Sequence, residues 1–230
     1  MKKVLDKWCD NLWIYFMCLV GSVSLGMLIA DWSTLTLGAK GGLFCAIIMP
    51  LHVIEEWKLP GGLHYFYNTL LGPKDPKEQQ LDRYPMSRFT DMQTNLVMQL
   101  LPLVYAAISE HSDLSDAFAI AAMLFSALEV VAHTSAGFMT KKLFSKKKAL
   151  YNPGLGTSYC LFLPAAIYLG CGVSQWSGRN WGLGILFLII VLVISVPLAE
   201  FPFRKWVSRQ EPGLFAFKSP RYFEQFIEKK

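Results

Sequence analysis

The feature that most constrains this chain is a series of long apolar blocks, each with no charged residue or only one, over about 18 to 30 residues. About 20 apolar residues in a helix cross the ~30 Å hydrocarbon core of a bilayer. Apolar residues make up 53% of the chain and charged residues only 17%. These blocks exclude a soluble globular enzyme, a disordered chain and a nucleic-acid-binding module. The sequence predicts an all-α polytopic membrane helix bundle, with residues 1–230 forming a single transmembrane domain.

Six of the blocks are expected to be transmembrane helices, because each is long enough to cross a bilayer at the helical rise, some with tilt. They lie at about 11–30, 35–54, 92–109, 117–140, 155–174 and 181–199. An inner loop is expected at 58–91. The tail 221–230 has apolar residues at helical spacing and is expected to lie on the inner leaflet as a short amphipathic helix.

The basic residues predict the orientation of these spans. With the N-terminus placed inside, every Lys and Arg except Lys40 and Arg179 falls in an inner segment, as the positive-inside rule requires. We therefore expect both termini in the cytoplasm and a multi-pass protein of the cell inner (cytoplasmic) membrane whose partners include membrane lipids. The net charge of +5 then reflects orientation, and no nucleic-acid partner is expected.

A first group of ionisable residues, His52, Glu55 and Glu56, lies at the inner end of the second span. Ionisable residues inside spans are costly, roughly 2.5–3.5 kcal/mol for Asp, Lys or Arg at the centre, and are functional candidates by default. On a helix, His52 faces the same side as the residues three and four positions later. Two adjacent carboxylates repel each other unless a cation lies between them, and a metal ion would supply that charge.

A second group, Glu129 and His133, is spaced by one helical turn on the fourth span. His133 precedes Lys141 by about 12 Å of helix, and His52 precedes Lys58 by about 9 Å. Both groups therefore fall at a similar depth, one to two turns beneath the cytoplasmic face. Two helices that carry imidazole and carboxylate at one level can close on one site.

The residues predicted to hold a divalent metal, zinc or iron, are His52, Glu56, Glu129 and His133. Glu55 is the predicted general base, and Tyr151 the predicted group that orients the substrate. Further candidates near that depth are His64, Asn95 and Asn152. Each group also has a structural interpretation: a solvated helix end, a hydrogen-bonded pair between helices, or turn chemistry before a helix.

Three elements occur in order: His52-x-x-Glu55-Glu56, a later intramembrane His133, and Tyr151-x-Pro153-Gly154. Together they resemble the HXXEE domain family of bacterial and archaeal integral membrane proteins. The resemblance covers roughly residues 35–199. It implies that these polar residues form a site, and the family is suspected of being enzymatic for the same reason, but it names no reaction.

Two functions from different classes fit these patterns. The first is a metal-dependent membrane hydrolase whose hydrophobic substrate, a lipid or a membrane peptide, enters from the inner leaflet. A di-metal oxidase-type enzyme is a variant that would need His64, Glu55 and Glu56 as ligands. The alternative is a small proton- or cation-coupled transporter that uses the same His and Glu residues, since Gly and Pro interrupt several spans. The absence of a visible repeat and of polar residues in the outer half of the spans weighs against this alternative.

Overall fold

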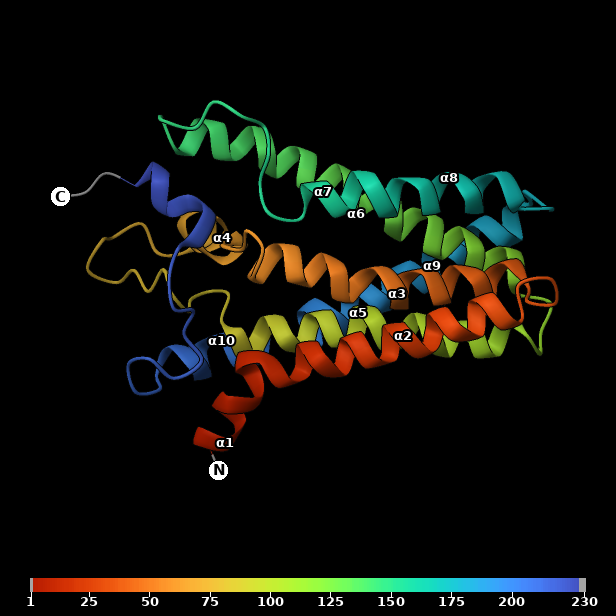
Figure 1. The fold of residues 1–230 in the computed structure, drawn as a ribbon, viewed down its shortest axis with the longest axis horizontal. Helices are drawn as coiled ribbons and strands as arrows, with labels where there is room; N and C mark the ends of the chain where they lie inside the picture. Colours follow the sequence, from red (N-terminus) through yellow and green to blue (C-terminus); the bar gives the residue numbers. More distant parts are fainter. Residues whose placement is uncertain (1, 228–230) are drawn as a thin grey trace.

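The computed structural model describes residues 2–227, and within that range the chain is helical, without strands. Figure 1 shows long helical rods that run along one axis, with α1 and the C-terminal helical segment at the same end. The prediction of an all-α bundle is confirmed.

The helices follow one another along the chain in rods, some of which contain π-helical turns. The first rod is α1 (Lys2–Lys7), η1 (Trp8–Leu12) and α2 (Trp13–Ala30). Next come α3 (Leu37–Trp57), α4 (Leu63–Leu71), α5 (Arg88–Ser109) and α6 (Ser115–Leu143). A further rod is α7 (Leu155–Thr157), η2 (Ser158–Phe162) and α8 (Leu163–Gly172). The last are α9 (Gly178–Val193), η3 (Ile194–Leu198), α10 (Phe201–Ser208) and the 3-10 helix η4 (Arg221–Phe226).

Several of these rods have the length and composition of membrane spans. Among residues 2–227, five helical stretches are long and apolar enough to cross a bilayer: Lys2–Ala30, Leu37–Trp57, Ser115–Leu143, Leu155–Gly172 and Gly178–Ser208. Large apolar side chains such as Leu19, Val23 and Ile189 are exposed on their outer faces, where a soluble protein would carry polar residues. The apolar rods indicate a membrane protein, and five of the six expected spans correspond to them.

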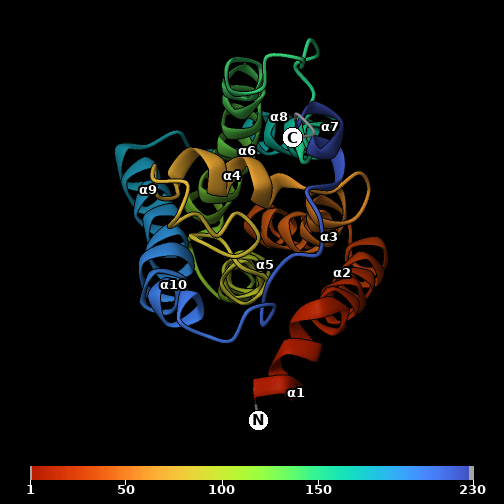
Figure 2. The same ribbon diagram turned by 90° about the vertical axis from the view of Figure 1, so that its left-hand side faces the viewer.

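The remaining expected span, 92–109, forms the longer helix α5, which is too polar to meet the same requirement. Figure 2 shows α5 between α3 and α10. Its polar side chains, such as Thr94 and Gln99, are buried there. On this side α5 faces other helices, where its polar groups find partners, while Leu100, Val104 and Ile108 on its other side are exposed.

The contact of α5 with α3 gives one example of a polar side chain that is hydrogen-bonded inside the bundle. Pro50 in α3 has no N–H, so the carbonyl of Ala46 lacks its usual helical donor. The Gln99 side chain supplies one, because its Nε2 donates to Ala46 O and to Met17 O, both at 2.9 Å. A Cβ on Gly42 would lie 2.2 Å from the Pro102 carbonyl oxygen. Glycine at this position therefore lets α3 and α5 approach closely.

Two expected features outside the spans differ from the structure. The segment 58–91 is not a plain loop, because it contains α4, which is packed against the end of the bundle with His64 and Phe66 buried. The tail forms η4, and its fully buried Phe223 packs against Phe66 and Phe144. Phe223 of the tail is therefore packed against protein, and residues 228–230 of the expected helix lie outside the described range.

Candidate metal centre

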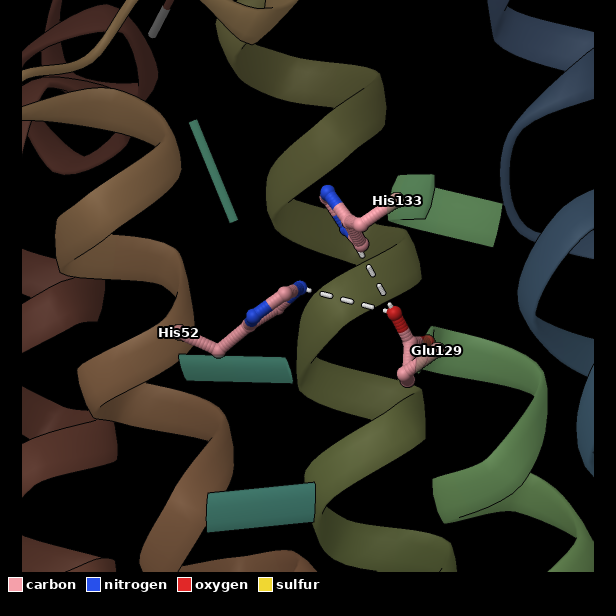
Figure 3. Close-up of side chains that lie close together, drawn as sticks. All are labelled: His52, Glu129 and His133. Atoms are coloured by element: carbon pink, nitrogen blue, oxygen red, sulfur yellow. Dashed lines mark ion pairs between the residues drawn. The ribbon is translucent and has the colours of Figure 1, made fainter. Parts of the chain in front are cut away.

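Two helices bring together the four predicted ligands, His52, Glu56, Glu129 and His133, referred to below as the His/Glu quartet. α3 and α6 run in the same direction and pack against each other. Each carries one imidazole and one carboxylate four residues apart, so both side chains project from one face of their helix. Figure 3 shows His52, Glu129 and His133 pointing toward a common centre. The shared depth expected for the two groups is therefore present in the structure.

Each imidazole of the quartet lies between both carboxylates. His52 Nε2 is 3.2 Å from Glu56 Oε1 and 3.5 Å from Glu129 Oε2. His133 Nε2 is 3.2 Å and 3.6 Å from the same two oxygen atoms. The four side chains are between 2% and 14% exposed. Within residues 2–227, no Lys or Arg forms an ion pair with Glu56 or Glu129.

These spacings match those of ligand atoms around one small cation. Zn²⁺ binds imidazole nitrogen and carboxylate oxygen at about 2.0–2.2 Å, so the corners of its tetrahedron are roughly 3.3–3.5 Å apart. The two imidazole nitrogens and one Glu129 oxygen also lie within 4.8 Å of one another. His52, Glu129 and His133 thus form a buried His/Glu group that could hold a metal ion.

A hydrogen-bond relay fixes the tautomer of His52. Thr157 Oγ1 donates to Glu55 Oε2 at 2.6 Å and lies 2.7 Å from His52 Nδ1. Because a hydroxyl has one proton, an oxygen that donates to the carboxylate must accept from Nδ1–H. A neutral His52 then keeps its lone pair on Nε2, which faces the quartet. This is the arrangement that metal-bound histidines require.

The Glu55 carboxylate is fully occupied by hydrogen bonds. It accepts from Gly156 N at 2.9 Å, Thr157 N at 2.7 Å, Thr157 Oγ1 at 2.6 Å and Tyr151 Oη at 2.9 Å. A carboxylate offers about four lone-pair sites, so all are used. The expected role of Glu55 as a general base does not fit this geometry. Through these hydrogen bonds Glu55 instead connects the end of α3 to the first turn of α7.

Tyr151 takes part in the same contact. Burial and the neighbouring Glu55 carboxylate raise the pKa of Tyr151 above its ordinary value, so the phenol keeps the proton that it donates. Its hydroxyl is directed to Glu55, and Tyr222 Oη donates to the Tyr151 carbonyl at 3.1 Å. The expected role of Tyr151 in orienting a substrate becomes one of holding Glu55.

His133 is packed against the segment that precedes α7. Its Nδ1 lies 3.4 Å from Asn152 Nδ2, and the buried Asn152 Oδ1 has no hydrogen-bond partner. A half-turn of this amide would place the oxygen beside Nδ1, where it accepts Nδ1–H and leaves Nε2 free for a metal. The candidate Asn152 therefore belongs to the surroundings of the quartet.

The other two candidates lie elsewhere. His64 in α4 stacks on Phe217 with ring centroids 3.8 Å apart. Asn95 Nδ2 donates to the carbonyl of Asp91, one turn earlier in α5, at 2.9 Å. The described contacts of both residues do not include the quartet. The di-metal variant would need His64 and a free Glu55 as ligands, and the structure supplies neither.

Thr157 and Gly156 are part of the site although the sequence patterns did not predict them. Neither has an ionisable side chain, so neither is out of place in an apolar span. The available signal was their position, two and three residues after the left-handed Gly154, in the first turn of a helix. Only the fold shows that this turn faces Glu55.

We predict that Gly154→Ala disrupts the centre. Gly154 has φ +96°, and a Cβ there would lie 2.0 Å from His133 Cε1. The left-handed conformation alone costs a non-glycine residue about 1–2 kcal/mol, and His133 must also move. Thermal unfolding in detergent should show a lower midpoint than wild type. Gly182→Ala in α9 has open space around its Cβ and should change stability by less than about 1 kcal/mol. Equal effects of the two substitutions would contradict the prediction.

Comparison with known proteins supports the resemblance seen in the sequence. Residues 43–169, more than half of the chain, match a family described as proteins of unknown function with an HXXEE motif. The match contains the quartet, Glu55 and the segment around Gly154. No curated protein and no solved structure matches the chain. The chain therefore belongs to the family of proteins that carry the HXXEE motif.

Proposed function

We propose that this protein is a metal-dependent enzyme of the cell inner membrane, a hydrolase that acts on a lipid or membrane peptide. The observation that carries the proposal is the spacing of the quartet, whose nitrogen and oxygen atoms lie 3.2–3.6 Å apart across two helices. His52, Glu129 and His133 are the proposed ligands, with zinc as the metal because two imidazoles and carboxylates suit its tetrahedral geometry. Iron is the alternative metal.

Glu56 lies beside the three proposed ligands. Its Oε1 is 3.2 Å from both imidazole nitrogens, so it would stand next to an ion held by the other three residues. A divalent ion held by these residues would supply Lewis acidity and would lower the pKa of a water molecule bound to it. Glu56 is then the nearest free carboxylate to accept a proton from that water, because the Glu55 oxygen atoms are already occupied. We therefore assign the base to Glu56 and a positioning role to Glu55.

The proposed membrane arrangement has six crossings in one transmembrane domain, with α5 as the central one and both termini in the cytoplasm. Two observations support it. α1 and η4 lie at the same end of the bundle, as an even number of crossings requires (Figure 1). Lys40 and Arg179 stand in the first turns of α3 and α9, which begin at the opposite end. The quartet then lies near the cytoplasmic face.

A hydrophobic substrate would approach the quartet from the bilayer. Glu129 is the most exposed of the four side chains, at 14%. Its neighbours on α6, Leu128 and Val131, are exposed apolar residues, which suit contact with lipid. By contrast, the outer halves of the apolar rods carry no Asp, Glu, His, Lys or Arg beyond their terminal turns. A transporter would need polar partners in both halves, so the enzyme is the better supported proposal.

The first test measures metal content. Wild-type protein purified without chelator should carry about one zinc or iron ion per chain, and His133→Ala should carry almost none, because loss of one ligand removes the closed site. Elemental analysis by mass spectrometry gives both values. His111→Ala, which alters an exposed histidine at the other end of the bundle, is the matched control and should keep the ion. Full metal content in His133→Ala would refute the site.

The second test addresses the Thr157 relay. Thr157→Val keeps the shape of the side chain but loses the hydroxyl that holds His52 Nδ1–H. Removing such a partner costs roughly 10–100-fold in metal affinity. Thr157→Ser keeps the hydroxyl and should bind metal like wild type. Competition with a chromophoric zinc chelator measures the affinities. Equal affinity in the Val and Ser variants would show that the relay does not support the metal.

The third test concerns the reaction. Protein reconstituted with zinc into liposomes of total membrane lipid should release a hydrolysis product detectable by mass spectrometry, or should cleave membrane peptides added to them. Glu56→Gln keeps the size of the side chain but cannot accept the proton, so its rate should fall at least about 100-fold. Glu55→Gln should retain more activity. Product formation that is unchanged in Glu56→Gln would contradict the assigned base.

A further inference from the structure

A second polar cavity lies at the end of the bundle where α1 and α4 pack, separate from the His/Glu quartet. It has a volume of about 190 Å³, more than ten times the roughly 10–15 Å³ that one water needs. Its charged and titratable lining residues are Asp10, Lys58, His64, Arg88, Lys218 and Arg221. They come from both ends of the chain, from α4 and α5, and from Lys58, which directly follows α3. None of them belongs to the proposed metal site.

The cavity has more positive than negative charge. Arg88 is paired with Asp6 at 2.7 Å and Asp10 at 3.3 Å, and Lys218 also pairs with Asp10, at 3.1 Å. Two carboxylates thus face four cations. Lys58 Nζ donates to a backbone carbonyl at 3.2 Å, and Arg221 Nη1 donates to another at 3.1 Å. Within residues 2–227, neither Lys58 nor Arg221 forms an ion pair with a carboxylate.

His64 adds a buried polar group without a partner. The ring is 4% exposed and stacks on Phe217, and its Nδ1 has no hydrogen-bond partner. Burial and the nearby Arg221 lower the pKa of His64 to about 3, so the imidazole is neutral at physiological pH and carries one N–H. Buried polar atoms are nearly always hydrogen-bonded, and an exception calls for an explanation such as a missing ion.

The walls of the cavity are held in place by specific contacts. Arg88 Nε donates to Ala216 O at 2.6 Å, Phe215 N donates to Asp6 Oδ1 at 2.7 Å, and Phe217 N donates to Asp82 O at 2.8 Å. These bonds fix the C-terminal segment over the end of α3. The wall formed by Arg88 and Phe217 is therefore held in place, and the exposed Lys218 and Arg221 lie on the solvent side of the cavity.

We propose that this cavity binds a phosphate group. A phosphate carries up to two negative charges and several acceptor oxygens, which suit the uncompensated Lys58 and Arg221 and a neutral imidazole donor. Two sources share this chemistry: a soluble phosphorylated compound and the headgroup of an anionic phospholipid. The proposal does not depend on the metal site, because the two sites share no residue.

The test uses the full-length protein in detergent and two probes. Inorganic phosphate is titrated by calorimetry, and phosphatidylglycerol retained from mixed micelles is counted by native mass spectrometry. Lys58→Gln and Arg221→Gln each remove one uncompensated cation and should weaken binding of the relevant probe roughly tenfold. Lys142→Gln, at an exposed lysine in the last turn of α6, removes the same charge elsewhere and should leave binding unchanged.

Each outcome has one meaning. Phosphate binding that is weakened in the two cavity variants supports the proposal with a soluble ligand. Retention of phosphatidylglycerol that is lost in the same variants, without phosphate binding, supports it with a lipid headgroup. The proposal is overturned if the protein binds neither phosphate nor phosphatidylglycerol. It is also overturned if Lys142→Gln weakens binding as much as the two cavity variants do.

His64→Phe provides a second variant that keeps the stacked ring. It removes the unpartnered nitrogen, so the melting temperature without phosphate should rise, while binding of the probe should weaken. A lower melting temperature together with unchanged binding would overturn the part assigned to His64.

Discussion

The centre of this structure depends on the burial of two carboxylates against two imidazoles where α3 meets α6. Charged groups are expensive to remove from water, and buried charges persist only when they are paired or bind a metal. His52 Nε2 and His133 Nε2 each lie within 3.6 Å of both carboxylates, so the quartet meets this requirement when these nitrogens carry protons or when a metal ion takes the place of the protons. A shift of either helix by one residue would turn an imidazole away and leave a carboxylate unpaired. The facing of α3 and α6 is therefore constrained by electrostatics as well as by packing.

The HXXEE motif divides its two acidic residues between different tasks. Glu56 is four residues after His52 and shares its face, so it enters the quartet. Glu55 is rotated by about 100° from it and accepts the amide protons of Gly156 and Thr157 at the start of α7. A carboxylate at a helix N-terminus is favourable, because the first amides have no partner within the helix. Glu55 thus brings α7 to the quartet, where Thr157 supports His52 and Gly154 makes room for His133.

The last turn of α3 connects two sites of opposite character. Glu56 belongs to the His/Glu quartet, which suits a cation. Lys58, two residues later, lines the basic cavity, which suits an anion. Trp57 lies between them in the chain and is bound through its indole N–H to Asp91 of α5.

The sequence by itself determined the helical class, the apolar rods and the four residues of the quartet. Helical periodicity fixes which residues share a face, and the cost of burying charge singles out His52, Glu56, Glu129 and His133. The sequence did not determine the role of Glu55, since adjacent carboxylates look alike until the donors around each are known. It grouped His64 and Asn95 with the quartet by depth alone, and the structure shows them in other contacts, with Phe217 and with the Asp91 carbonyl. Thr157, the burial of Phe223 and the basic cavity depend on segments distant in the chain. Only the tertiary structure decides such contacts, because a hydrogen bond or packing contact between two distant segments produces no periodic pattern in the sequence of either segment.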